Sequence, residues 1–187
     1  MPDGSRIARV SVETPTEDGP EAIVAACIAV ARSVRERVPA DLAPDGLEAI
    51  GISSPGPLDP WAGVVVEPPN LGPRFVDVPL AAELEAALGL PAYLERDTNV
   101  AALAEQAYGA GRGIDDFIYL TVSTGVGGAV VTDGRLLLGP DGVAGELGHL
   151  VVDFGPDAAP CGCGGFGHVE AYASGRALAR DAVAAVR

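Results

Sequence analysis

Two stretches of the chain carry apolar residues at the spacing of one helical face. The first stretch follows Pro20, whose fixed φ suits the first position of a helix. Its apolar residues lie at intervals of four, three and four: Ile23, Cys27, Val30 and Val34. The second stretch ends before Gly89 and repeats every four residues: Leu80, Leu84 and Leu88. This periodicity predicts an amphipathic helix in each stretch.

Outside these helices, short apolar runs rich in β-branched residues predict strands. They cover residues 9–14, 47–53, 64–67, 92–95, 117–123, 126–132 and 135–138. Thr124 and Gly125 form the turn of an expected hairpin within 117–132. Further helices are predicted over 98–108 and 169–187, the second weakened at Gly175. Strands that alternate with helices indicate an α/β fold.

Composition narrows the class of protein. With 187 residues and 48% hydrophobic residues, the chain has material for one ample domain or two small ones. Its formal charge of −14 and the lack of a basic patch argue against a nucleic-acid partner. The first ten residues hold no signal-peptide core, and no apolar run reaches the roughly 20 residues of a membrane span. We therefore expect a soluble cytoplasmic protein with no membrane partner.

A cluster of cysteine and histidine residues is the first sign of a metal site. Cys161, Cys163 and His168 lie within eight residues, in a glycine-rich segment that lets the backbone curl. His149, the chain's other histidine, lies twelve residues before Cys161 and is the candidate fourth ligand. Such a set of nitrogen and sulfur ligands suits a structural Zn²⁺ ion. The alternative is two loop thiols with unrelated histidines. The third cysteine, Cys27, stands among apolar residues and is interpreted as a buried, inert thiol.

The same segment carries a resemblance to a known family. Its motifs are Gly145-Glu146-x-Gly148-His149 and Cys161-x-Cys163-Gly164-x-x-Gly167-His168-x-Glu170. Other matching segments, in the same order along the chain, are Gly51 to Asp59, Pro69-Asn70-Leu71, Glu95 to Ala102 and Thr121 to Gly128. Together they resemble the ROK family (repressors, open reading frames and kinases), which includes bacterial glucokinases, fructokinases and N-acetylmannosamine kinases.

The resemblance implies an actin-like, ribonuclease-H-like α/β fold of two lobes, over residues 1–96 and 97–187. It implies ATP-dependent phosphorylation of a hexose hydroxyl, with glucose the expected sugar, Mg²⁺ accompanying ATP, and a dimer when full length. Asp97 would be the general base, although an Asp before Thr and a helix is also a common N-cap. Polyphosphate stays open as an alternative phosphoryl donor.

The resemblance also assigns binding residues. Glu146, His149 and Glu170 would contact sugar hydroxyls, although Glu170 alone could be a solvated helix carboxylate. Backbone N–H groups at Thr124, Gly125 and Gly127 would contact ATP phosphates, although this turn could be a plain hairpin.

Three departures from the family pattern bear on function. Arg96 stands where the family usually has a sugar-binding Asn, so Arg96 is the expected substrate contact there. His168 stands where a third Cys is usual, and histidine also ligates zinc. The family's opening Asp-x-Gly-Gly-Thr-Lys strand and its C-terminal adenosine-binding part have no counterpart, so we expect a fold incomplete at both ends. A sugar-sensing regulator fragment and a non-catalytic sugar- and zinc-binding remnant are the alternative functions.

Overall fold

The chain is described by a computed structural model that covers residues 5–39, 41, 46–68 and 70–186. It divides into two compact units, Met1–Asp97 and Thr98–Arg187. Pro69 of the Pro-Asn-Leu motif lies outside the described residues. None of the described helices is both long and apolar enough to cross a bilayer. The two functional lobes expected from the sequence stay a prediction.

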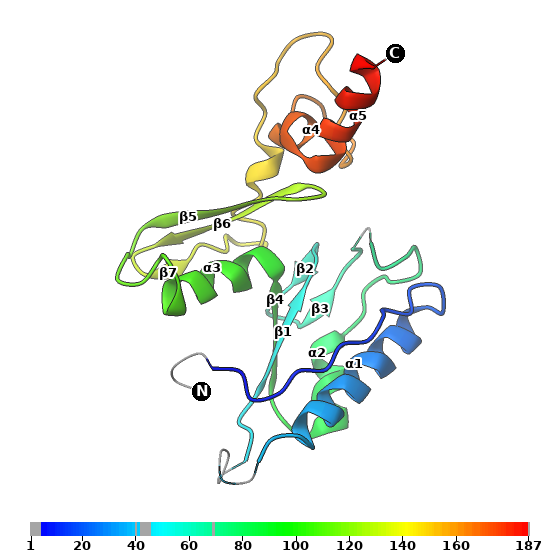
Figure 1. Ribbon diagram of the computed structural model, residues 1–187, viewed down its shortest axis with the longest axis vertical. Coiled ribbons are helices and arrows are strands. Elements are labelled where there is room, and N and C mark those ends of the chain that lie inside the picture. The colour runs from blue at the N-terminus through cyan, green and yellow to red at the C-terminus, as the bar shows by residue number, and fades with distance from the viewer. Residues whose placement is uncertain (1–4, 40, 42–45, 69, 187) are drawn as a thin grey trace. The chain divides into compact units, whose positions relative to one another are not determined.

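The first unit is built on a pair of parallel strands (Figure 1). Strand β1 (Ile50–Ser54) pairs with β4 (Ala92–Arg96), with Ile50 opposite Ala92 and Ser54 opposite Arg96. The crossover between them contains a short antiparallel pair, β2 (Leu58–Asp59) and β3 (Val64–Val65), followed by α2 (Leu80–Leu88). Helix α1 (Pro20–Arg35) packs beside α2.

The core of the first unit confirms the predicted face of α2 in full and that of α1 in part, since Val30 and Val34 lie outside the core cluster. All three leucines of α2 are buried, and Ile23 and Val24 are the buried residues of α1. They join Phe75, which is almost fully enclosed, and the strand residues of the same cluster: Leu58, Val65 and Leu94. Cys27 is partly buried against this core, and this burial raises the pKa of its thiol.

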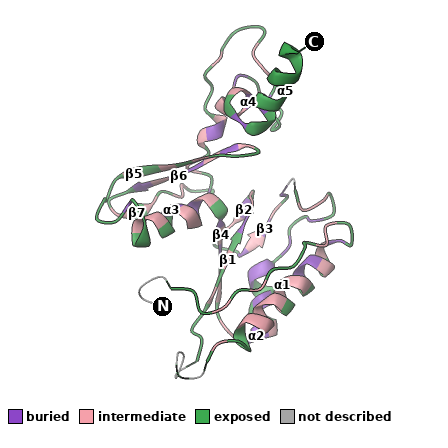
Figure 2. Ribbon diagram, in the orientation of Figure 1, coloured by how far each residue is buried: buried purple, intermediate pink, exposed green. Residues whose placement is uncertain are grey.

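The second unit contains an antiparallel sheet in the order β5, β6, β7. Its strands are β5 (Phe117–Val122), β6 (Val126–Thr132) and β7 (Arg135–Leu136), so the predicted hairpin is confirmed. Helix α3 (Asp97–Tyr108) contributes Ala102 to a small core with Ala129 and Val131. Figure 2 shows buried segments of β6 in purple. After the sheet come a short 3₁₀ helix, η1 (Leu147–His149), and two helices, α4 (Val169–Ala173) and α5 (Gly175–Ala185).

Two sequence predictions are wrong. Residues 9–14 form no strand, because a strand exists only where a neighbour completes its hydrogen-bond ladder, and no described strand pairs with them. The helix expected over 169–187 is interrupted at Ser174. The Ser174 hydroxyl accepts a hydrogen bond from the Ala177 N–H at 3.2 Å, which is an N-cap, so the chain starts a new helix there.

Candidate functional site

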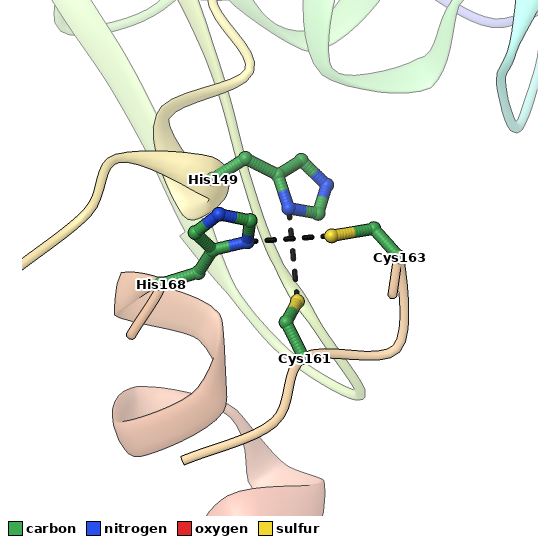
Figure 3. A group of neighbouring side chains, drawn as sticks. All are labelled: His149, Cys161, Cys163 and His168. Carbon is green, nitrogen blue, oxygen red and sulfur yellow. Dashed lines mark hydrogen bonds between the residues drawn. The ribbon is translucent and has the colours of Figure 1, made fainter. Parts of the chain in front are cut away.

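Four side chains of the second unit converge on one point (Figure 3). His149 ends η1, Cys161 and Cys163 lie on the following loop, and His168 immediately precedes α4. One ligand atom from each residue lies within 4.8 Å of all the others. Cys161 Sγ is 3.8 Å from His149 Nδ1, and Cys163 Sγ is 3.3 Å from His168 Nδ1. The structure therefore brings together all four residues predicted as metal ligands.

These distances fit a tetrahedral metal site. Zinc bonds of about 2.3 Å to sulfur and about 2.05 Å to nitrogen place neighbouring ligand atoms about 3.5 Å apart. The two sulfur–nitrogen pairs of 3.8 and 3.3 Å lie on either side of that value. The two imidazole rings stand edge to face, with centroids 5.3 Å apart, and the Nδ1 atom of each faces a cysteine sulfur. The donor set and its spacing therefore fit Zn²⁺.

The glycines of this loop are required by its backbone. Gly164 and Gly167 have φ of 89° and 71°, in the left-handed region that side chains disfavour. Gly164 N–H donates to the Cys161 carbonyl at 3.0 Å, which closes the turn between the two cysteines. A Cβ at Gly167 would lie 1.9 Å from the Asp153 carbonyl oxygen. The curl predicted from the glycine content is thus confirmed at these two positions.

Burial divides the cluster into an inner and an outer side. Cys161 is 8% exposed, and burial is the main cause that raises the pKa of its thiol. The backbone N–H of Cys163 acts in the opposite direction, while the Cys163 side chain and Glu170 add to the rise. Cys163 is exposed, and both histidines are half-buried. A bound divalent cation would act in the opposite direction on Cys161, because it stabilises the thiolate.

The two predicted sugar-binding carboxylates lie beside the cluster. Glu146 Oε2 is 3.9 Å from His149 Nε2, the ring nitrogen that does not face the cysteines. Glu170 Oε1 is 3.8 Å from Cys161 Sγ, and Glu170 Oε2 accepts a hydrogen bond from the Val126 N–H at 2.8 Å. One carboxylate thus flanks His149, and the other reaches the glycine-rich turn between β5 and β6.

The glycine-rich turn is closed by the hydrogen bond from Ser123 N–H to the Gly125 carbonyl at 2.8 Å. Thr124 is exposed at its tip, and a Cβ at Gly125 would lie 2.3 Å from Glu170 Oε2. Gly127 lies within β6, opposite Thr121, where a Cβ would lie 2.8 Å from Thr98 Cγ2. The small size of Gly125 and Gly127 therefore has a packing reason within this unit.

The predicted catalytic segment lies at the end of β4. Arg96 is the last residue of that strand and is 4% exposed, and its Cδ lies 3.5 Å from where a Cβ at Gly56 would stand. Asp97 is exposed and is the first residue of α3. A carboxylate that follows the carboxyl end of a parallel strand is well placed to face a ligand. The grouping of Asp97 with Glu146 and Glu170 stays a prediction.

Two contacts of the site were missed by the sequence analysis. A Cβ at Gly148 would lie 1.9 Å from the Val126 carbonyl oxygen, and the Gly175 N–H donates to the Ser123 carbonyl at 2.8 Å. Gly148 precedes a predicted ligand, and Gly175 weakens a predicted helix, so the sequence marked both positions as unusual. Neither signal indicates which distant backbone the glycine approaches.

A likeness to known proteins accompanies this geometry. The model of the ROK family matches residues 2–185, so the chain belongs to the ROK family. It is 41% identical over 180 residues to a glucokinase of Thermotoga maritima, and the match covers 95% of this chain and 53% of that protein. It is 38% identical over 135 residues to a xylose repressor of Caldicellulosiruptor bescii, and the match covers 72% of this chain and 33% of that protein.

A solved structure supports the fold. The crystal structure of a ROK hexokinase from Thermus thermophilus matches 98% of this chain and 58% of that one, with a TM-score of 0.83 and 45% identity. The predicted actin-like α/β fold is thereby confirmed. The chain spans about half the length of the glucokinase and hexokinase that it matches.

Proposed function

We propose that this protein is a sugar kinase that transfers a phosphoryl group from ATP to a hexose hydroxyl, with glucose as the first candidate. One observation carries the proposal: in a chain of the ROK family, the four-ligand cluster stands beside Glu146 and Glu170. Carboxylates accept strong hydrogen bonds from neighbouring hydroxyls, so this arrangement suits a polyol. The similarity to a glucokinase and a hexokinase supports the reaction type.

The cluster of His149, Cys161, Cys163 and His168 would hold a structural Zn²⁺. Four protein ligands fill a tetrahedron and leave no open position for a reacting water, so the ion would order the loop and take no part in phosphoryl transfer. The segment has few buried apolar residues and many glycines, so a bound ion would add to its stability. His149 would then bind zinc through Nδ1 while Nε2 stays available to Glu146 or to the sugar.

Asp97 would accept the proton of the attacking hydroxyl. The sugar oxygen would form a bond to the γ-phosphorus while the bond from that phosphorus to the β–γ bridging oxygen breaks, and the hydroxyl proton would move to an Asp97 carboxylate oxygen. Mg²⁺ would accompany ATP and bind its phosphates. Arg96, the neighbour of Asp97, would be the remaining sugar contact, as an Arg in place of the usual Asn.

The turn from Ser123 to Val126 would contact the ATP phosphates. The N–H groups of Ser123 and Val126 are already engaged, by the Gly125 carbonyl and by Glu170. None of the hydrogen bonds among the described residues uses the N–H of Thr124 or of Gly125. These two groups are therefore the phosphate donors that the turn offers, with Gly127 acting through its small size.

Purified protein incubated with ATP, Mg²⁺ and a panel of hexoses tests the reaction through ADP release. We expect hexose-dependent ADP release, fastest with glucose and absent without sugar. Polyphosphate in place of ATP tests the donor, and gel filtration tests the dimer expected of the full-length protein. No ADP release with any hexose, by protein that is folded and contains zinc, would contradict the proposal.

A sugar-responsive regulator is the second candidate, because a xylose repressor is among the similar proteins. It predicts sugar binding without turnover. Calorimetric titration with the same sugars separates this outcome from an inert protein, since a regulator binds a sugar and releases no ADP.

A further inference from the structure

The turn between β5 and β6 is held by residues that adjoin two of the candidate metal ligands. Glu170, two residues after His168, accepts the Val126 N–H at 2.8 Å. Gly148, the residue before His149, packs so closely that a Cβ there would lie 1.9 Å from the Val126 carbonyl oxygen. The backbone of Val126 is thus held by two neighbours of the cluster, through a hydrogen bond at its N–H and close packing at its carbonyl.

Val126 is a position where the sheet itself offers no partner for the N–H. It is the first residue of β6 and pairs with Val122, yet its N–H donates to a side chain 44 residues away. Val126 is also buried, at 4% exposed, and a buried N–H must find a partner within the protein. The Glu170 carboxylate is the partner, and a charged acceptor makes this hydrogen bond stronger than an ordinary one.

A third contact holds the other side of the turn. The N–H of Gly175, the first residue of α5, donates to the Ser123 carbonyl at 2.8 Å. A Cβ at Gly175 would lie 2.8 Å from the same oxygen. Helices α4 and α5 follow His168 directly. The chain therefore contacts the turn through both Glu170 and Gly175 within seven residues of His168.

We propose that Glu170 is a positioning residue that transmits metal occupancy from the His/Cys cluster to the Ser123–Val126 turn. With the ion bound, His149 and His168 are fixed, so Gly148 and Glu170 hold Val126 in place. Without the ion, these neighbours are released, and the Val126 N–H exchanges with solvent. The inference rests on the proposed function for the metal and for the phosphate contact of the turn. It gives the structural ion a second effect, on the nucleotide side of the site.

The assignment also alters the role of Glu170. A carboxylate has two oxygens, and Oε2 is engaged by Val126 while Oε1 lies 3.8 Å from Cys161 Sγ. A sugar hydroxyl would therefore bind a carboxylate in which both oxygens already have a neighbouring partner. Loss of Glu170 is expected to weaken nucleotide binding even when no sugar is present, which a residue that contacts sugar alone would not do.

Amide hydrogen exchange at Val126 tests the inference without any assay of activity. In zinc-loaded Glu170→Ala protein we expect exchange at Val126 to be about tenfold faster than in the parent, as loss of a hydrogen bond to a charged group implies. Glu170→Gln keeps an acceptor oxygen and should retain most of the protection. Amides of β1 and β4 serve as the control and should be unchanged. Chelation of zinc from the parent protein should also accelerate exchange at Val126.

Zinc content measured on the same samples separates the possible failures. Unchanged exchange at Val126 in zinc-loaded Glu170→Ala overturns the inference and leaves the metal site standing. Protein that takes up no zinc overturns both the metal site and the inference. Unchanged exchange at Val126 after chelation, in protein that stays folded, overturns the link between the metal and the turn. The hexose assay is independent, so a failed kinase proposal is recognised separately.

Discussion

The hydroxyl of Tyr172 donates a hydrogen bond to Asp153 Oδ2 and accepts one from the Ala159 N–H at 2.9 Å. Asp153 in turn accepts the Gly155 N–H at 2.8 Å through Oδ1. The two side chains thus close the loop that leads from η1 to Cys161. The hydrogen bond between them raises the pKa of the Tyr172 hydroxyl and lowers the pKa of Asp153. Tyr172 therefore fixes the path of the chain into the metal cluster.

Removal of this contact should loosen the hold on the ion. In Tyr172→Phe the ring remains, while Asp153 and the Ala159 N–H lose their common partner. We expect zinc to pass to a chromophoric chelator about tenfold faster, the lower end of what outer ligand contacts contribute. Tyr108→Phe is the matched control, because Tyr108 is 57% exposed on α3 of the same unit. Equal release rates in the two variants would remove the role given to Tyr172.

The ligand set predicts the zinc content of variants. Cys161→Ser should lower zinc well below one ion per chain, because it removes the buried sulfur of the cluster. His168→Cys should keep about one zinc, because three cysteines and one histidine form a common structural set. Cys27→Ser should leave the zinc content unchanged, since Cys27 belongs to the core of the other unit. Elemental analysis of unchelated protein measures all three. Full zinc in Cys161→Ser would contradict the assignment.

Local patterns predicted most of the elements. Leu80, Leu84 and Leu88 recur at the helical period, and all three are buried in α2, because one face of that helix meets the core. The hairpin turn at Thr124 and Gly125 was predicted from residues on either side of it. The strand predicted over residues 9–14 does not form, because a strand depends on a partner elsewhere in the chain, and a local pattern does not encode that partner.

The site divides in the same way. The four metal ligands could be predicted because cysteine and histidine are rare in this chain, with three and two copies, and glycines surround them. The hydrogen bond from the Val126 N–H to Glu170 could not be predicted, because the flexible side chain of a helix carboxylate can reach many partners. The burial of Arg96 could not be predicted either, because an arginine side chain is usually exposed.

The three cysteines should differ in their reaction with an alkylating reagent. Burial raises the pKa of the Cys27 thiol, so its thiolate is scarce near neutral pH and alkylation should be slow. The rate at Cys27 should rise with pH through a midpoint above the usual thiol value of about 8.5. In zinc-loaded protein Cys161 and Cys163 should also be protected, and chelation should expose Cys163 first because it is solvent-exposed while Cys161 is buried.

Peptide mass spectrometry after timed alkylation measures each cysteine separately. Rapid modification of Cys163 in zinc-loaded protein would show that its sulfur is no metal ligand. Rapid modification of Cys27 at neutral pH would show that the α1 face is more open than the structure indicates. The two results concern different units, so neither affects the interpretation of the other.

Asp97→Asn tests the proposed general base. An amide keeps the size of the side chain but cannot take up the hydroxyl proton, so we expect turnover to fall by a factor of about 10² to 10⁴. Sugar affinity, measured by calorimetry, should change far less, because the amide still offers an oxygen acceptor and adds N–H donors. Glu95→Gln is the matched control, since it removes one negative charge two residues away on β4. Unchanged turnover in Asp97→Asn would refute the role, and equal losses in the two variants would show an effect of charge on the whole segment.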